Sequence, residues 1–106
     1  MFTMGIIKDR NDNAGQHFFD KSTLRFFSSR FSDDVFQGPA GVFFVTSEQL
    51  KGFDCPDGKR LYTVRQFHPD TAKVSTSGKF QEHHSLRSAK CVAAATAAGH
   101  YKPSKP

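Results

Sequence analysis

The chain has 106 residues, of which 37% are hydrophobic, and this size supports one modest core with no room for a second domain. No apolar run approaches the ~20 residues that a membrane helix needs, and the N-terminus lacks the charged-then-apolar order of a secretory signal. We therefore expect a soluble intracellular protein. The net charge of +5 and the pI of about 9.5 favour an anionic partner, although a charge of magnitude ~2–8 is also ordinary for solubility alone.

The two ends of the chain lack the pattern of a packed element. Residues 1–16 place Ile6 and Ile7 before a polar, turn-forming run, which predicts a loosely ordered N-terminal arm, with or without a helical turn. Residues 102–106 contain two prolines, and proline lacks the backbone donor that a helix requires, so we expect a disordered tail. Residues 17–101 remain as a single domain.

A short first helix is predicted after Asp20. This residue stands where an N-cap accepts hydrogen bonds from the first backbone N–H groups of a helix. Leu24, Phe27 and Phe31 then follow at helical spacing. The pattern therefore supplies the N-terminal helix of the expected fold.

Two strands joined by a tight turn are predicted next. Residues 35–37 and 42–46 are rich in branched and aromatic side chains, and the sequence Gly-Pro-Ala-Gly at 38–41 separates them. The run over 42–45 is apolar on both faces. It should therefore be a central strand, or one of its faces should be covered by the first helix.

The second half of the chain predicts two more strands and a long helix. Residues 60–67 and 72–80 alternate as strands do, and an Ala-rich helix follows over 84–98. Ahead of these strands, residues 47–50 suit a single helical turn and residues 56–59 suit an exposed tight turn.

The late helix has a distinct apolar face, whose small residues suit close packing on a Phe-rich sheet. The residues expected to be buried are Leu86, Ala89, Val92, Ala93, Thr96 and Ala97. Those expected to be exposed are His83, Arg87, Lys90 and Ala94. The elements together predict an α+β domain: a small, mainly antiparallel sheet of three or four strands, a C-terminal helix packed across it, and a short N-terminal helix.

Phenylalanine dominates the large side chains, with 12 copies and no tryptophan. Aromatic residues on an exposed sheet face can stack on unpaired bases, a contact worth ~1–3 kcal/mol per base. A domain of this size, however, needs most of its large apolar side chains for its own core. Core packing is therefore the favoured interpretation of each phenylalanine.

The sequence carries no recognisable catalytic or metal motif. His84 and Cys91 lie two helical turns apart and can face the same way, but a zinc site needs two further ligands. Cys55 and His68 lack the local motif of a nucleophile pair. We expect the two cysteines to be reduced thiols, and we expect no enzyme activity, no cofactor and no metal.

Basic residues supply the candidate binding site. If the predicted strands and helix form one layer, five basic side chains gather on a single electropositive surface that can bind nucleic acid or another anionic partner. They are Arg60, Arg65, Lys79, Arg87 and Lys90. The stretch that includes 62–65, 78–80 and Ala93 is similar in outline to the sheet-and-helix DNA-binding domains of phage-type integrases and plant AP2 factors. Residues 85–90 resemble the last helix of double-stranded-RNA-binding domains, but the lysine pair of that family is absent.

Four segments resemble a family of small uncharacterised proteins of tailed bacteriophages and prophages. They are HFFD at 17–20, TLRFFSSR at 23–30, GVFFVTSEQ at 41–49 and YTVRQF at 62–67. The resemblance spans roughly residues 17–98 and implies a phage origin and a life in the cytoplasm of a host bacterium. It implies no established activity and no catalytic residues.

Two functions follow as hypotheses. The favoured one is that a small basic phage accessory protein binds nucleic acid through the sheet and the exposed face of the late helix. The alternative is an inhibitor that binds and blocks a host protein or a defence complex, as an anti-CRISPR or other anti-defence factor does. Neither hypothesis involves a membrane, and the sequence leaves the oligomeric state open.

Overall fold

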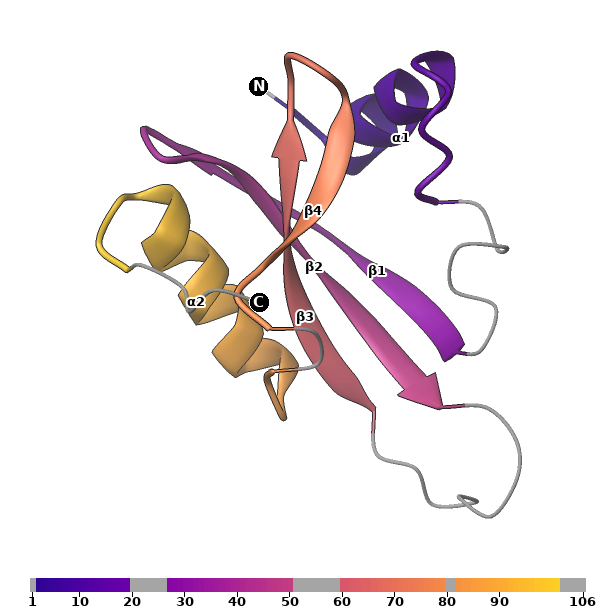
Figure 1. Ribbon diagram of the computed structural model, residues 1–106. Coiled ribbons are helices and arrows are strands. Elements are labelled where there is room, and N and C mark those ends of the chain that lie inside the picture. The colour runs from indigo at the N-terminus through magenta and orange to yellow at the C-terminus, as the bar shows by residue number, and fades with distance from the viewer. Residues whose placement is uncertain (1, 20–26, 51–59, 80–81, 102–106) are drawn as a thin grey trace.

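The computed structural model describes residues 2–19, 27–50, 60–79 and 82–101. These residues form two helices and four strands in the order α1 (Met4–Asn13), β1 (Phe27–Gly38), β2 (Gly41–Leu50), β3 (Leu61–His68), β4 (Lys73–Ser77) and α2 (Leu86–Ala97). The strands form one sheet in the order β1-β2-β3-β4, and each neighbouring pair is antiparallel. The two helices lie on opposite sides of this sheet (Figure 1). The fold is therefore α+β, as the sequence predicts.

Strand β2 is central, and both of its faces are buried. Val42 and Phe44 point to the α1 side, where they join Ile7 and Phe67 in one apolar cluster. Phe43 and Val45 point to the α2 side, where they join a second cluster. Successive side chains of a strand alternate between faces, so a continuously apolar run fits a strand covered on both sides. This confirms the prediction of a central strand over 42–45.

Helix α1 replaces the loosely ordered arm that was predicted for residues 1–16. The Thr3 hydroxyl caps the helix by accepting a hydrogen bond from the backbone N–H of Ile6 at 3.2 Å. Met4 and Ile7 are buried against the sheet, and Ile7 has no exposed surface. The arm prediction is wrong for this stretch, because these two apolar side chains anchor a helix whose other residues are mostly polar.

A short N-terminal helix is present, but not where the spacing of Leu24, Phe27 and Phe31 placed it. Residues 27–38 belong to β1, which pairs with β2 from Phe27 opposite Leu50 to Gly38 opposite Gly41. The register shifts between Phe31 and Val35, where four steps along β1 face two along β2, so an irregularity interrupts the alternation of this strand and hides its period. Residues 20–26 lie outside the described residues.

Strand pairing also corrects the helical turn that was predicted at 47–50. These residues extend β2 to Leu50, and Glu48 pairs with Leu61 of β3. The predicted exposed turn at 56–59 and the predicted tail at 102–106 fall outside the described part of the chain. The two last strands lie close to their predicted ranges, although β4 ends at Ser77.

Helix α2 forms as predicted and packs across the sheet. The Ser85 hydroxyl caps its start by accepting a hydrogen bond from the N–H of Ser88 at 3.1 Å. Gly99, at a φ of 84°, ends the helix, since the left-handed conformation favours glycine. Ala89, Ala93, Thr96 and Ala97 are buried as expected, whereas Leu86 is 38% exposed.

His83 is buried, which contradicts its predicted place on the exposed side of the helix. It lies before the helix begins, and its backbone N–H and C=O exchange hydrogen bonds with Tyr62 of β3 at 3.0 and 2.9 Å. The chain thus returns to the edge of β3 before it enters α2. Helical spacing does not apply to a residue that pairs as a strand does.

The β1–β2 turn packs tightly against the end of α2. The backbone N–H of Ala40 donates to the Ala97 carbonyl at 3.0 Å. A Cβ atom added at Gly38 would collide with the same carbonyl oxygen, so the close approach requires glycine there. The turn and the helix end are therefore fixed relative to each other.

We expect Ala93→Leu to lower the free energy of unfolding by roughly 1–3 kcal/mol, because extra methylene groups overpack a filled interface. Ala93 has no exposed surface and lies between α2 and the sheet. Urea unfolding measures the loss. The control is Ala94→Leu, the same change at the neighbouring exposed position. Equal stability of the two variants would contradict the observed packing of α2.

Candidate functional site

Arg65 does not lie on the surface that was predicted for it. The residue is only 5% exposed and lies on the α1 side of the sheet. Its Nε donates to the Thr46 hydroxyl at 3.0 Å, and a terminal guanidinium nitrogen donates to the Thr76 hydroxyl at 2.7 Å. The guanidinium also lies 5.3 Å from the centre of the Phe18 ring. The expectation of an exposed Arg65 is wrong, and the residue serves as a structural tie across three strands.

Arg60 lies on the other side of the sheet. It is half-buried beside β2 and donates from a terminal nitrogen to the Ser47 carbonyl at 3.2 Å and to the Ser47 hydroxyl at 3.0 Å. Its partner Ser47 and the Arg65 partner Thr46 are consecutive residues of β2, so their side chains lie on opposite faces of the sheet. The strand therefore separates the two arginines that the sequence prediction placed together.

The three other predicted residues lie around α2. Lys90 is part of the helix and forms an ion pair with Asp34 of β1. Arg87 is exposed and forms no ion pair with any residue whose position is described. Lys79 is exposed in the segment between β4 and α2, and its backbone N–H donates to the Glu82 carboxylate at 3.3 Å. Arg87 and Lys79 thus present cationic side chains to solvent.

The charge of the chain is concentrated in its last segment. Residues 83–106 contain no acidic residue and four basic ones, Arg87, Lys90, Lys102 and Lys105. This segment therefore carries a formal charge of +4 out of the +5 of the whole chain. Within α2 itself, the charged side chains are Arg87 and Lys90, and no acidic residue belongs to the helix.

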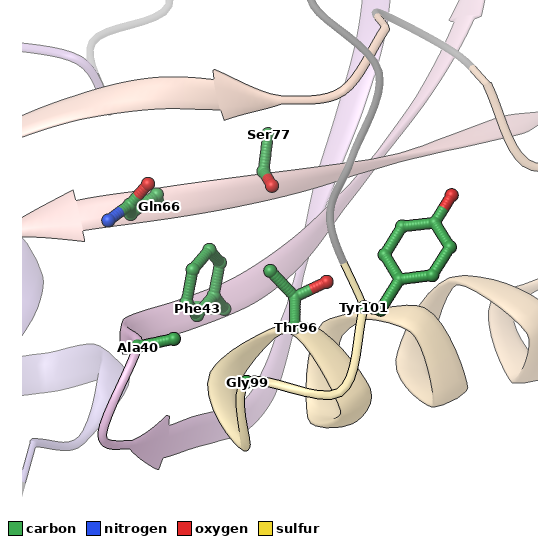
Figure 2. Close-up of a pocket in the computed structure, with 7 residues that line it drawn as sticks. All are labelled: Ala40, Phe43, Gln66, Ser77, Thr96, Gly99 and Tyr101. Atoms are coloured by element: carbon green, nitrogen blue, oxygen red, sulfur yellow. The ribbon is translucent and has the colours of Figure 1, made fainter.

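A cavity of about 280 Å³ lies between the C-terminal end of α2 and the strands. Figure 2 shows its lining, with strand residues on one side and residues from the end of the helix on the other. The lining residues are Ala40, Phe43, Gln66, Ser77, Thr96, Gly99 and Tyr101. Helix α2 packs mainly on β2 and β3, and Ser77 at the end of β4 completes the lining.

The lining of this cavity is uncharged and combines aromatic with polar groups. Phe43 is 2% exposed, whereas Tyr101 is 38% exposed. Neither the Gln66 amide nor the Ser77 hydroxyl makes a hydrogen bond to a described residue. Ser77 is nevertheless only 8% exposed, and its hydroxyl is directed into the cavity (Figure 2). Both groups line the cavity and can form hydrogen bonds to a ligand there.

Sequence reasoning missed this cavity. Gln66 and Ser77 fall on the α2 side of β3 and β4, at positions that share a face with Val64. The sequence did contain a signal for the cavity. Each of two neighbouring predicted strands has a polar residue at a position that faces the core.

The described residues contain no group of three or more His, Cys, Asp or Glu side chains that could hold a metal ion. Cys91 is a free thiol on the exposed side of α2, and Cys55 lies outside the described residues. His68 forms a hydrogen bond with the Ser75 hydroxyl at 2.7 Å. A Ser–His nucleophile also needs a group that orients the imidazole, and none of the described residues bonds to its other nitrogen.

The class defined by this structure is a small α+β domain with a four-stranded antiparallel sheet and a helix on each face. A family model matches residues 3–94, and the chain therefore belongs to DUF7447, a family of unknown function. No curated protein and no solved structure matches the chain. No helix in the described ranges is long and apolar enough to cross a bilayer.

Proposed function

We propose that this chain is a small basic bacteriophage accessory protein that binds nucleic acid in the host cytoplasm, without catalysis. The observation that carries the proposal is the segment 83–106, which has four basic residues, no acidic residue and an exposed Arg87. Phosphate contacts supply most of the affinity of proteins that bind nucleic acid without sequence preference. A helix face of one charge sign suits such contacts.

The proposed interface is the outward face of α2 together with Lys79. The Arg87 guanidinium presents several donors in a planar fork, which matches the oxygens of a phosphate. Lys79 adds a second exposed charge in the segment between β4 and α2. Lys90 contributes less, because Asp34 already neutralises it. The phosphate contacts do not involve an open aromatic sheet face, since Phe43, Phe44 and Phe67 are core residues with at most 2% exposure.

Replacement of Arg87 by Ala tests this interface. The variant should bind oligonucleotides of every sequence more weakly. Because one phosphate contact is lost, the negative slope of log affinity against log salt concentration should become shallower by ~1. Affinities measured by fluorescence anisotropy at several salt concentrations give the slope. The control is Lys8→Ala, which removes the same charge from α1 on the opposite face. An equal effect of both variants would show that only net charge matters.

The alternative function, a blocker of a host protein, is supported by a different observation. Leu86 and Tyr101, near the two ends of α2, are each 38% exposed, and large apolar side chains of this kind act as anchors in protein interfaces. A host protein captured from a bacterial lysate after nuclease treatment, and lost with Leu86→Ala, would favour this function. Capture that disappears after nuclease treatment favours nucleic-acid binding.

A further inference from the structure

The cavity at the end of α2 has the chemistry of a site for a neutral, planar and polar group. The Gln66 amide both donates and accepts hydrogen bonds, and the Ser77 hydroxyl does the same. Phe43 and Tyr101 supply aromatic surface on the same cavity (Figure 2). None of the lining residues is charged at neutral pH, so a charged group would lose its hydration there without compensation.

A cationic side chain lies close to the lining residues along the chain. Lys79, which is exposed, lies two positions beyond Ser77. A ligand that places a neutral group in the cavity would therefore bind more tightly if it also carried an anionic group outside the cavity. A nucleotide has this arrangement, with an uncharged base attached to a charged phosphate.

Resting on the proposed function, we infer that this cavity binds one unpaired base of a single strand whose phosphates follow α2. The twelve steps from Arg87 to Gly99 span about 18 Å at the helical rise of 1.5 Å per residue. A base in a duplex is stacked and paired and cannot enter the cavity without cost. The protein therefore prefers single strands to duplexes.

The experiment compares two charge-matched ligands. One is a labelled single-stranded DNA of about ten nucleotides, and the other has the same backbone with abasic sugars, so both offer the same phosphates. The strand with bases should bind roughly ten- to a hundredfold more tightly, the range expected when a base stacks on an aromatic side chain. Tyr101→Ala should remove most of this difference. Tyr101 is partly exposed, so its loss leaves the core intact.

Ile6→Ala is the matched control, since it removes a large exposed side chain from α1 on the other face. It should leave the preference for bases unchanged. Equal affinity for both strands would overturn the base site while leaving phosphate binding in place. A preference for bases that survives in both Tyr101→Ala and Ser77→Ala would overturn the location. Binding of neither strand at low salt would overturn this inference and the proposed function together.

Discussion

Phe44→Ala should lower the free energy of unfolding by ~3–5 kcal/mol, the usual cost of removing a fully buried aromatic ring. Phe44 lies on the central strand and has no exposed surface. It belongs to the cluster that includes Ile7 and Phe67, and the Phe19 ring lies 6.0 Å away. Small domains unfold with a total free energy of about 5–15 kcal/mol, so this loss removes a large part of the stability.

Urea unfolding followed by circular dichroism measures the loss. Phe36→Ala is the comparison, because Phe36 is only half-buried, near the β1–β2 turn. The effect there should be clearly smaller, in proportion to the apolar surface removed from contact. A Phe44 variant no less stable than the Phe36 variant would be inconsistent with a sheet buried on both faces.

Asn11→Ala should lower the free energy of unfolding by about 2–4 kcal/mol, because it leaves two buried backbone groups without their hydrogen-bond partners. Asn11 has no exposed surface. Its side-chain NH₂ donates to the Ala72 carbonyl at 2.7 Å, and its side-chain oxygen accepts from the Phe18 backbone N–H at 2.8 Å. It thus ties α1 to the β3–β4 turn, where Ala72 adopts a positive φ of 58°.

Asn13→Ala is the matched control, since Asn13 is exposed on the same helix. The free energy of unfolding of that variant should lie within a few tenths of a kcal/mol of the value for the unchanged protein, as is usual for surface substitutions. Thermal unfolding of the two variants side by side gives the comparison. If Asn11→Ala were as mild as Asn13→Ala, α1 would not be held to the sheet by this side chain.

The strands and the late helix could be predicted because local pattern and tertiary environment agree there. Residues 42–45 are apolar on both faces and are covered on both faces. The alanine-rich face of α2 packs where its helical spacing points, and Gly38 and Gly41 mark the turn. At each of these positions, the conformation that the local sequence favours is also the one that the packing of the whole domain requires.

The first third of the chain could not be predicted, because its folding depends on distant partners. Phe27 and Phe31 fall at helical spacing, but they pair with residues of β2 at the far end of a long hairpin. Such long-range pairing overrides a local preference. Helix α1 has only two buried apolar residues, Met4 and Ile7, and the polar Asn11 completes its contact with the rest of the chain. A sequence pattern gives no indication of that role for asparagine.

The candidate site was partly predicted. Arg87 and Lys79 are exposed as expected, whereas the position of Arg65 depends on which face of β3 meets α1. The prediction recognised the strand but did not assign its faces, and a shift of one position moves a side chain across the sheet. The cavity requires the relative placement of the β1–β2 turn, β3, β4 and the end of α2, which no local pattern encodes.

The most direct test of the proposed function is the affinity of the whole chain for a random single-stranded oligonucleotide at two salt concentrations. We expect clear binding at low salt and a steep loss of affinity as salt rises, because each phosphate contact releases a counterion. A matched duplex of the same length should bind more weakly if the cavity accepts a base. Absence of binding at low salt would contradict the account and leave the blocking of a host protein as the better explanation of the basic face.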